Sequence, residues 1–256
     1  MTARSSMIFA LALVAASLAI AAQAAELKVL STGAMKPVVL AGANDFQKQS
    51  GHTLAVENDT AGALAKRIEG GAVFDVAINS PAIVDDLIAK GKIAAGTRTN
   101  IARVGVGVMV KAGAAKPDIS SVDAFKKALL AAKSVGYIDP ASGGSSGIYL
   151  EKLFERLGIA DAIKAKAKLK QGGYVADIVS NGDAEIGLHQ ISEILPATGI
   201  TLVGPLPAEI QNYTVYAAGI GASAKETAGA AALIKFLVSP ELSEVLRAKG
   251  MERPAS

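Results

Sequence analysis

The sequence predicts an α/β protein of two lobes, and three observations support this fold class. Short apolar runs typical of buried strands alternate with helical stretches along nearly the whole chain, as in proteins with mostly parallel sheets. Two longer apolar strands, near Val104 and near Val215, separate a central segment from both chain ends. The chain is therefore expected to cross between the lobes on these two strands, and such hinged lobes normally bind a ligand between them.

Each expected element follows from local sequence signals. The expected strands are residues 27–30, 53–56, 73–78, 104–110, 134–138, 185–188, 201–203 and 213–220. The expected helices are residues 34–49, 61–68, 81–88, 122–132, 148–157, 190–195, 225–238 and 240–249. Pro37 and Pro81 fit the first turns of their helices, where a missing N–H costs little, and Thr60 is a suitable N-cap.

The N-terminus has the features of a signal peptide. Arg4 precedes an almost unbroken apolar run over residues 7–22, and Ala22-Gln23-Ala24 gives the small-x-small pattern of a cleavage site after Ala24. A transmembrane anchor is the alternative, but the run is short for a ~20-residue span and no stop-transfer charges follow it.

The remaining chain is expected to be a periplasmic monomer that does not insert into the membrane. Residues 1–24 are then the signal peptide. Lobe 1 is expected to comprise residues 25–104 plus 216–256, and lobe 2 is expected to comprise residues 105–215.

Composition and missing motifs exclude several function classes. The chain has no cysteine, which rules out disulfides, thiolate nucleophiles and cysteine-ligated metals. The formal charge of +3 is too small to indicate nucleic-acid binding, and the absence of tryptophan disfavours stacking platforms for bases. No nucleophile elbow, P-loop, metalloprotease helix or dinucleotide-binding glycine motif occurs. We therefore expect no cofactor and no metal.

Three turns share one design, in which a strand ends, small residues follow and a helix begins. Small residues let the backbone approach a ligand closely, and the free N–H groups of a helix start favour an anion. Each turn alone is weak evidence, because glycine and serine are ordinary turn and capping residues. Their recurrence at strand ends, where open α/β sheets bind ligands, indicates an anion site. The candidate ligand-binding residues in these turns are Ser31, Thr32, Gly33, Thr60, Ala61, Gly62, Ser142, Ser145 and Ser146.

Charged and titratable side chains offer a functional and a structural interpretation. Arg103, at the mouth of the first long strand, could bind a carboxylate by paired hydrogen bonds or be a solvated strand end. His189 ends a buried strand and could donate to an anion or move a proton, or it could be purely structural. Glu193 could act with His189, or could simply complement the dipole of the helix that it begins. His52 lies in a polar turn and is expected to be exposed.

Several segments resemble the periplasmic molybdate-binding protein family. They are residues 27–35, residues 61–71 with Asp75-Val76, residues 139–149, and residues 182–187. The resemblance covers nearly all of the mature chain. It implies a type II periplasmic-binding-protein fold that delivers a small anionic ligand to an ABC permease.

The same resemblance implies a ligand site with few side-chain donors. At the family's ligand positions it places Ala34, Ala61 and Gln190 where the family has two serines and a tyrosine. It places backbone donors near Ser146 and near Val175 or Gly172. Molybdate or tungstate as the ligand is therefore disfavoured.

These departures are similar to a branch of the family that includes the periplasmic aconitate isomerase. The segments concerned are residues 29–33, 116–120, 141–143, 147–150 and 190–193. The similarity implies a small polycarboxylate as ligand. If chemistry occurs, it implies a cofactor-free allylic proton shift between trans- and cis-aconitate, with His189 or Glu193 as the base. Three hypotheses stay open: passive anion binding for ABC uptake, which is favoured, aconitate isomerisation, and molybdate or tungstate binding.

Overall fold

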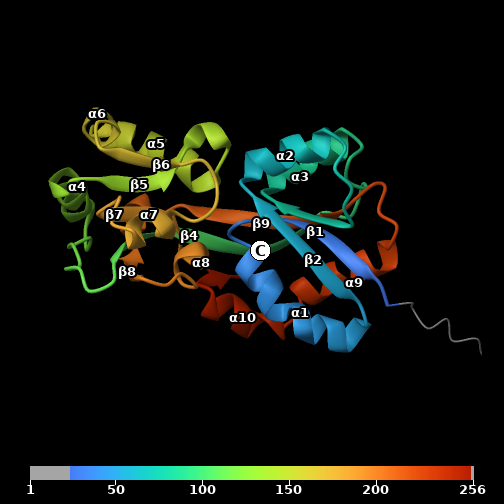
Figure 1. Cartoon of the computed structure of the whole chain (residues 1–256). Coiled ribbons are helices and arrows are strands. Elements are labelled where there is room, and N and C mark those ends of the chain that lie inside the picture. The colour runs from blue at the N-terminus through green and yellow to red at the C-terminus, as the bar shows by residue number, and fades with distance from the viewer. Residues whose placement is uncertain (1–23, 255–256) are drawn as a thin grey trace, which may run out of the picture.

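Two long strands, β4 (Thr99–Lys111) and β9 (Tyr213–Ile220), connect two α/β halves. The structure is a computed structural model that describes residues 24–254, so the expected signal peptide lies outside the described residues apart from Ala24. Figure 1 shows the halves side by side, with the central part of the chain forming one of them and both ends of the described chain forming the other. The expected lobe limits fall within β4 and β9 and stay a prediction.

The first half contains a sheet in which β1 (Glu26–Thr32), β2 (Thr53–Asp59) and β3 (Val76–Asn79) run parallel. Strand β9 pairs antiparallel with β3 and with the start of β4, and the short β10 (Met251–Glu252) also pairs with β4. Helices α1 (Lys36–Ser50), α9 (Thr227–Leu237) and α10 (Leu242–Ala248) pack on one face. Helices α2 (Ala61–Glu69) and α3 (Pro81–Ala89) pack on the other face (Figure 1).

The second half contains a sheet in which β5 (Val135–Ile138) runs parallel to β6 (Ala167–Lys170) and β7 (Ile186–Gln190). The end of β4 pairs antiparallel with β7 and with β8 (Ile200–Pro205). Helices α4 (Val122–Ala131), α5 (Ser145–Arg156) and α6 (Ala160–Lys164) share one core. Helix α7 (Val175–Ser180) and the single turn α8 (Ile191–Ile194) complete the half, with the 3₁₀ turns η1 (Pro140–Ser142) and η2 (Ala208–Ile210).

The predicted α/β fold class and the strand-helix alternation are confirmed. Strands β1 to β3 run parallel in the first half and β5 to β7 run parallel in the second, whereas β4 and β9 pair antiparallel, because the chain leaves the first half on one of them and returns on the other. Thr60 caps α2 as predicted, since its hydroxyl accepts the N–H of Ala63 at 3.2 Å. Pro37 and Pro81 lie in the first turns of α1 and α3.

The prediction that His52 is exposed is wrong. Its side chain is only 5% exposed, because the N-terminal segment and α9 cover the polar turn in which it lies. Its Nδ1 accepts the N–H of Ala25 at 3.2 Å, and its ring stacks on Phe46. His52 is therefore a structural residue of the first half.

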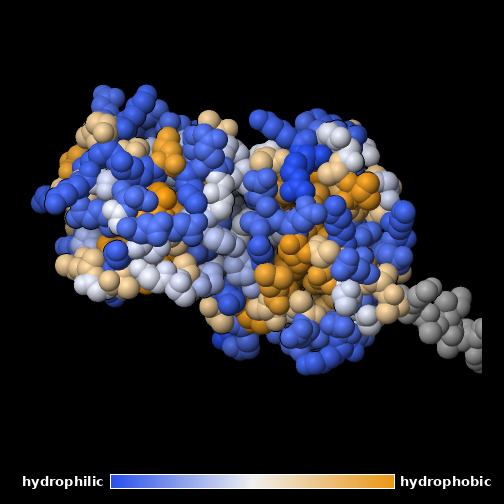
Figure 2. Space-filling model, viewed as in Figure 1, coloured by the Kyte–Doolittle hydropathy of each residue, from blue (hydrophilic) through white to orange (hydrophobic). Residues whose placement is uncertain are grey.

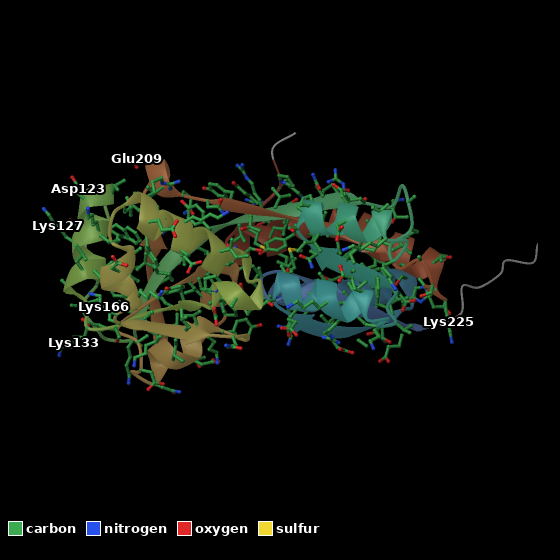
Figure 3. All side chains as sticks on the ribbon, turned by 90° about the horizontal axis from the view of Figure 1, so that it is seen from above. Asp123, Lys127, Lys133, Lys166, Glu209 and Lys225 are labelled. Atoms are coloured by element: carbon green, nitrogen blue, oxygen red, sulfur yellow. The ribbon has the colours of Figure 1, made fainter. Side chains whose placement is uncertain are left out.

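The surface is indented where the two halves meet (Figure 2). Labelled charged side chains lie far from this region, at the outer ends of the molecule (Figure 3): Asp123, Lys127, Lys133, Lys166, Glu209 and Lys225. Among residues 24–254, no helix has the length and apolar character needed to span a membrane.

Candidate functional site

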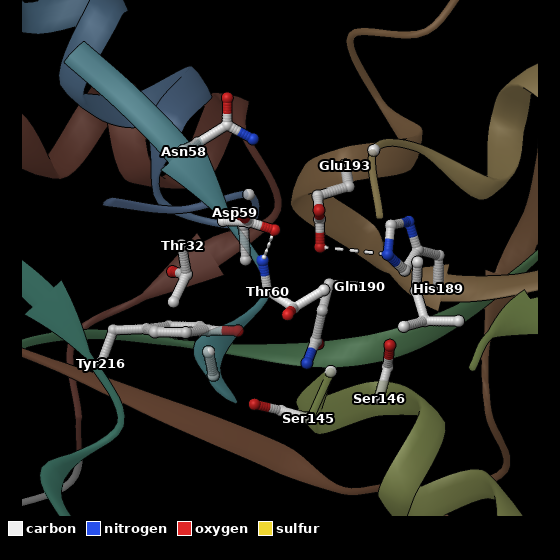
Figure 4. A pocket seen from close by; sticks show the side chains of 16 residues that line it. Thr32, Asn58, Asp59, Thr60, Ser145, Ser146, His189, Gln190, Glu193 and Tyr216 are labelled. Carbon is white, nitrogen blue, oxygen red and sulfur yellow. Dashed lines mark hydrogen bonds and ion pairs between the residues drawn. The ribbon is translucent and has the colours of Figure 1, made fainter. Parts of the chain in front are cut away.

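A cavity lies between the two halves, where the carboxyl ends of β1, β2, β5 and β7 converge with the side of β9 (Figure 4). This is the edge at which open α/β sheets bind ligands. Among residues 24–254, no lysine or arginine lines this cavity, so the donors that its wall offers to an anion are neutral. The lining residues are Thr32, Gly33, Ala34, Asn58, Asp59, Thr60, Ala61, Ile138, Gly144, Ser145, Ser146, Gly173, His189, Gln190, Glu193 and Tyr216.

One long helix begins at the cavity without a side-chain cap. Helix α5 starts at Ser145, and its N-cap residue Gly144 has no side chain to bond the first N–H groups. Helix α1 starts at Lys36, two residues beyond Ala34, but it contributes less, because Pro37 has no N–H and the N–H of Val38 donates to the carbonyl of Met35 at 3.1 Å. Uncapped N–H groups and the positive end of the helix dipole attract an anion.

Several buried polar atoms of the wall have no hydrogen-bond partner. They are Oγ1 of Thr32, Nδ1 of His189 and Oε1 of Gln190. The other end of the Gln190 amide is engaged, because its Nε2 donates to Oγ1 of Thr214 at 2.9 Å. An unpaired buried polar atom costs free energy, so the wall is suited to a polar guest. An anionic guest could pair the hydroxyl of Thr32, which donates, but not Oε1 of Gln190, which only accepts.

His189 and Glu193 form a buried pair on one wall. Nε2 of His189 lies 3.4 Å from Oε2 of Glu193, at the long end of the hydrogen-bond range (Figure 4). Burial lowers the pKa of His189 to about 3, and burial raises the pKa of Glu193 to about 8. At pH 7 both side chains are therefore mainly uncharged, so the contact joins an imidazole and a carboxylic acid rather than an ion pair.

The carboxyl group of Glu193 reaches across to the first half. A Cβ atom added to Gly33 would lie 2.3 Å from Oε1 of Glu193, a separation that real Cβ atoms do not show. Glycine at position 33 is therefore required for this approach. Glu193 is thus enclosed by both halves.

A second contact between the halves borders the cavity, and we name it the clasp: Thr60, Gly62, Ser142 and Gly143. The hydroxyl of Thr60 donates to the carbonyl of Ser142 at 2.6 Å, and the N–H of Gly62 donates to the carbonyl of Gly143 at 3.1 Å. A Cβ on Gly62 would lie 2.9 Å from Cα of Gly143. The clasp therefore holds the start of α2 directly against the turn before α5.

Nine of the sequence-predicted site residues line the cavity, and five do not. Gly62 and Ser142 belong to the clasp, and the hydroxyl of Ser31 donates to the carbonyl of Thr32. Val175 is fully buried in the core of the second half. Arg103 lies outside the wall, where it pairs with Glu252 at 2.7 Å and stacks over the ring of Tyr213.

Five polar or backbone-exposing residues of the wall are not among the predicted site residues: Asn58, Asp59, Gly144, Gly173 and Tyr216. Asn58 and Asp59 end β2 and so obey the same strand-end rule as Thr32, but the strand was expected to stop at residue 56. Tyr216 gave no signal, because a tyrosine in a long apolar strand is typical of a core.

Comparisons with known proteins identify the family of this chain. Residues 27–252 match the family described as bacterial extracellular solute-binding protein. The chain is 31% identical over 249 residues to an aconitate isomerase of a Pseudomonas species, covering 95% of this chain and 94% of that protein. It is 28% identical over 254 residues to the molybdate-binding protein ModA of Azotobacter vinelandii, covering 93% and 94%.

Solved structures match the fold as well. The periplasmic molybdate-binding protein of Azotobacter vinelandii superposes with a TM-score of 0.76 at 21% identity, covering 90% of this chain and all of that one. The family match spans nearly all of the described residues, and the fold and the cavity between the halves are consistent with it. The chain therefore belongs to the family of bacterial extracellular solute-binding proteins.

Proposed function

We propose that this protein captures a small organic polycarboxylate in the cavity between its halves. The observation that carries the proposal is the character of the wall. Its donors are neutral hydroxyls and the N–H groups at the uncapped start of α5, and its buried Glu193 is a carboxylic acid at neutral pH. A carboxylic acid and several separated neutral donors suit a guest with several carboxylates.

Two further points favour a polycarboxylate over a tetrahedral oxyanion. Ala34 and Ala61 line the cavity at positions where the molybdate-binding family is expected to have serines, so those side-chain donors are missing. The relative named aconitate isomerase matches this chain at a higher identity than the relative named for molybdate binding.

We infer that the protein is exported to the periplasm and passes its ligand to a membrane permease. Support comes from the family, whose members are extracellular solute-binding proteins. The signal-peptide pattern of residues 1–24 supports export as well.

Thermal unfolding with candidate ligands tests the proposal. The mature chain is heated with citrate, trans-aconitate, cis-aconitate, sulfate, molybdate or tungstate. A ligand at 100 times its dissociation constant stabilises the folded chain by about 2.7 kcal/mol, so the tricarboxylates are expected to raise the Tm by several degrees. Stabilisation by micromolar molybdate, with none by the tricarboxylates, contradicts the proposal.

Isomerisation of aconitate is a second candidate function, and the His189–Glu193 pair favours it. A pKa of about 8 makes Glu193 a stronger base than an ordinary carboxylate, while His189 with a pKa of about 3 is a weak one. In its ionised form, Glu193 would take a proton from the methylene carbon of trans-aconitate. The C–H electron pair would move into the allylic system and onto its carboxylate.

The step is completed without a co-reactant. The carboxyl group of Glu193 returns the proton to the carbon at the other end of the allylic system, where a C–H bond forms. The double bond has then moved to the carbon that lost its proton. Neutral donors of the wall would stabilise the charge that develops on the ligand carboxylate. Atoms and electrons therefore balance within the ligand and Glu193 alone.

Incubation of purified protein with trans-aconitate, followed by chromatography of cis-aconitate, tests this second candidate. Loss of the base in Glu193→Gln is expected to lower the rate at least ~100-fold, the usual range for general acid-base catalysis. Glu244→Gln, at an exposed position on α10, is the matched control. Absence of turnover by the unaltered chain leaves only binding, and full turnover by Glu193→Gln excludes Glu193 as the base.

A further inference from the structure

Tyr216 lies on β9 and contributes both to the apolar core of the first half and to the wall of the cavity. Its ring packs in the apolar core of the first half together with Ile101 and Met35, and the side chain is only 2% exposed. The same residue also lines the cavity between the halves, where Figure 4 shows it with its hydroxyl directed toward the other lining side chains. A buried tyrosine of this kind usually needs a partner for its hydroxyl.

The cavity wall does not supply that partner. Among the lining residues drawn in Figure 4, interactions are marked only between Asp59 and Thr60 and between His189 and Glu193. Oγ1 of Thr32, another hydroxyl of the same wall, is buried without a partner among the described residues. Burial and the nearby Glu193 raise the pKa of Tyr216, so its phenol keeps its proton and remains a donor.

Gln190 does not offer a donor to the cavity. At the carboxyl end of β7, its Nε2 donates to Thr214, and the atom left unpaired is the acceptor Oε1. An anion cannot accept from an acceptor oxygen. The phenol of Tyr216, on β9, adds a donor to the first-half side of the wall beside the hydroxyl of Thr32.

We infer that Tyr216 is a ligand-binding residue, whose hydroxyl donates a hydrogen bond to a carboxylate of the bound guest. The inference rests on the proposed function for the class of guest. Its physical basis is separate, because a phenylalanine would fill the same core space, and the hydroxyl that distinguishes tyrosine belongs to the residue's cavity-lining side. The hydroxyl is therefore expected to contribute to ligand binding and not to the stability of the fold.

Tyr216→Phe, measured against Tyr149→Phe, tests the inference in the full mature chain. Tyr149 also carries a partly buried hydroxyl, but that hydroxyl donates to the carbonyl of Ile210 and lies outside the cavity wall. Calorimetric titration with trans-aconitate and citrate gives the Kd, and thermal unfolding without ligand gives the Tm.

Tyr216→Phe is expected to weaken binding about 10- to 100-fold, as for a lost hydrogen bond to a charged group, with an unchanged or higher Tm without ligand. Tyr149→Phe is expected to lower the Tm and leave the Kd unchanged. A Tyr216→Phe variant that binds like the unaltered chain overturns the inference. So does one whose Tm falls as far as that of Tyr149→Phe, since that result identifies a structural hydroxyl.

Titration of the same variants with molybdate separates this inference from the proposed function. An unaltered chain that binds molybdate and neither tricarboxylate contradicts the proposed ligand class. Weaker molybdate binding by Tyr216→Phe then still supports Tyr216 as a donor to the bound anion. Unchanged molybdate binding by that variant overturns the role of Tyr216 as well.

Discussion

The clasp and the cavity wall contain similar residues, yet they differ in what their polar groups bind. In the clasp, the hydroxyl of Thr60 and the N–H of Gly62 both donate to carbonyls of the opposite half. In the wall, Thr32, His189 and Gln190 each keep a buried polar atom without a protein partner. Contact between the halves pairs the polar groups of the clasp. In the wall, the hydroxyl of Thr32 stays free to donate to an anionic guest, whereas Oε1 of Gln190 can only accept a hydrogen bond.

This difference shows how a turn of small residues should be interpreted. Such a turn indicates that something approaches the backbone closely, but the approaching group can be a ligand or another part of the protein. At Gly33 it is the carboxyl group of Glu193, and at Gly62 it is the backbone of Gly143. The two regions therefore contribute to ligand retention in different ways. The clasp holds the two halves together, and the wall binds the ligand directly.

Gly62→Ala is expected to have the largest effect, because it breaks the clasp without changing the cavity wall. The new methyl group would lie 2.9 Å from Cα of Gly143, so the halves must move apart. Overpacking of this kind costs about 1–3 kcal/mol, which corresponds to a roughly 10- to 100-fold weaker Kd for a tricarboxylate. Calorimetric titration gives the Kd, and small-angle scattering should show a larger radius of gyration.

Gly70→Ala, at the other end of the same helix, is the control for this substitution. Gly70 has a φ of −70°, which alanine adopts readily, and it takes no part in the clasp. Alanine is the better helix former, so neither substitution is expected to destabilise α2 itself. Unchanged affinity and an unchanged radius of gyration in Gly62→Ala would show that closure does not depend on the clasp.

Glu193→Gln is expected to have the next largest effect, on the pH dependence of binding. With a pKa of about 8, Glu193 is mainly protonated at pH 7 and mainly ionised at pH 9. An ionised Glu193 repels an anionic guest, so the Kd of the unaltered chain should weaken about tenfold between these pH values. The glutamine variant should lack this dependence. A parallel pH profile in both proteins would contradict the assignment.

The same substitution should alter stability without ligand in a defined direction. The pKa of Glu193 in the folded chain lies above the ordinary value of 4.5, so the folded state binds more protons than the unfolded state between pH 4.5 and about 8. Its contribution to stability is therefore lost as the pH rises through that range. Denaturant titration should show Glu193→Gln gaining stability relative to the unaltered chain from pH 5 to pH 8.

Thr60→Val should have a smaller effect on affinity, because it removes one clasp hydrogen bond and leaves the glycine contact. A loss of about 1 kcal/mol corresponds to a roughly fivefold weaker Kd. The variant also loses the N-cap of α2, so Ser121→Ala, which removes the N-cap of α4 in the second half, is the matched control. Thr60→Ser keeps both bonds and should behave as the unaltered chain.

Both Thr60→Val and Ser121→Ala are expected to lower the free energy of unfolding by about 1 kcal/mol. Only Thr60→Val should weaken the Kd. Equal affinities in the two variants would reduce the role of Thr60 to capping.

The sequence could predict the fold and part of the cavity wall because both depend on local patterns. Strand ends followed by small residues identified Thr32, Thr60 and Ser145, since the carboxyl ends of parallel strands meet at one edge. The pairing of the clasp was not predictable in this way. Thr60 and Ser142 are 82 residues apart, and which turns contact each other depends on how the two halves close.

Local sequence patterns also do not predict which side chains of the long connecting strands reach the cavity. Tyr216 reaches the cavity because of the register of β9, in which it lies opposite Ala102 of β4. Alternation along a strand that is buried on both faces does not distinguish a core-facing ring from one whose hydroxyl enters a cavity. The burial of His52 is not predictable for a similar reason, since the groups that cover it come from distant parts of the chain.

Arg103→Ala is expected to have the smallest effect on affinity. It tests whether Arg103, which does not line the cavity, contributes to ligand binding. Sequence reasoning offered Arg103 as a carboxylate-binding residue, whereas in the structure its guanidinium pairs with Glu252 and stacks over Tyr213. Partly exposed ion pairs contribute about 0–1 kcal/mol, so the Tm should change little. The Kd for a tricarboxylate should stay within about twofold, because the neutral donors of the wall do not involve this residue. Glu252→Gln is the control for loss of the ion pair. A Kd that is tenfold weaker in Arg103→Ala but not in the control would mean that Arg103 leaves Glu252 to bind the guest. The donors to the guest would then include a charged side chain.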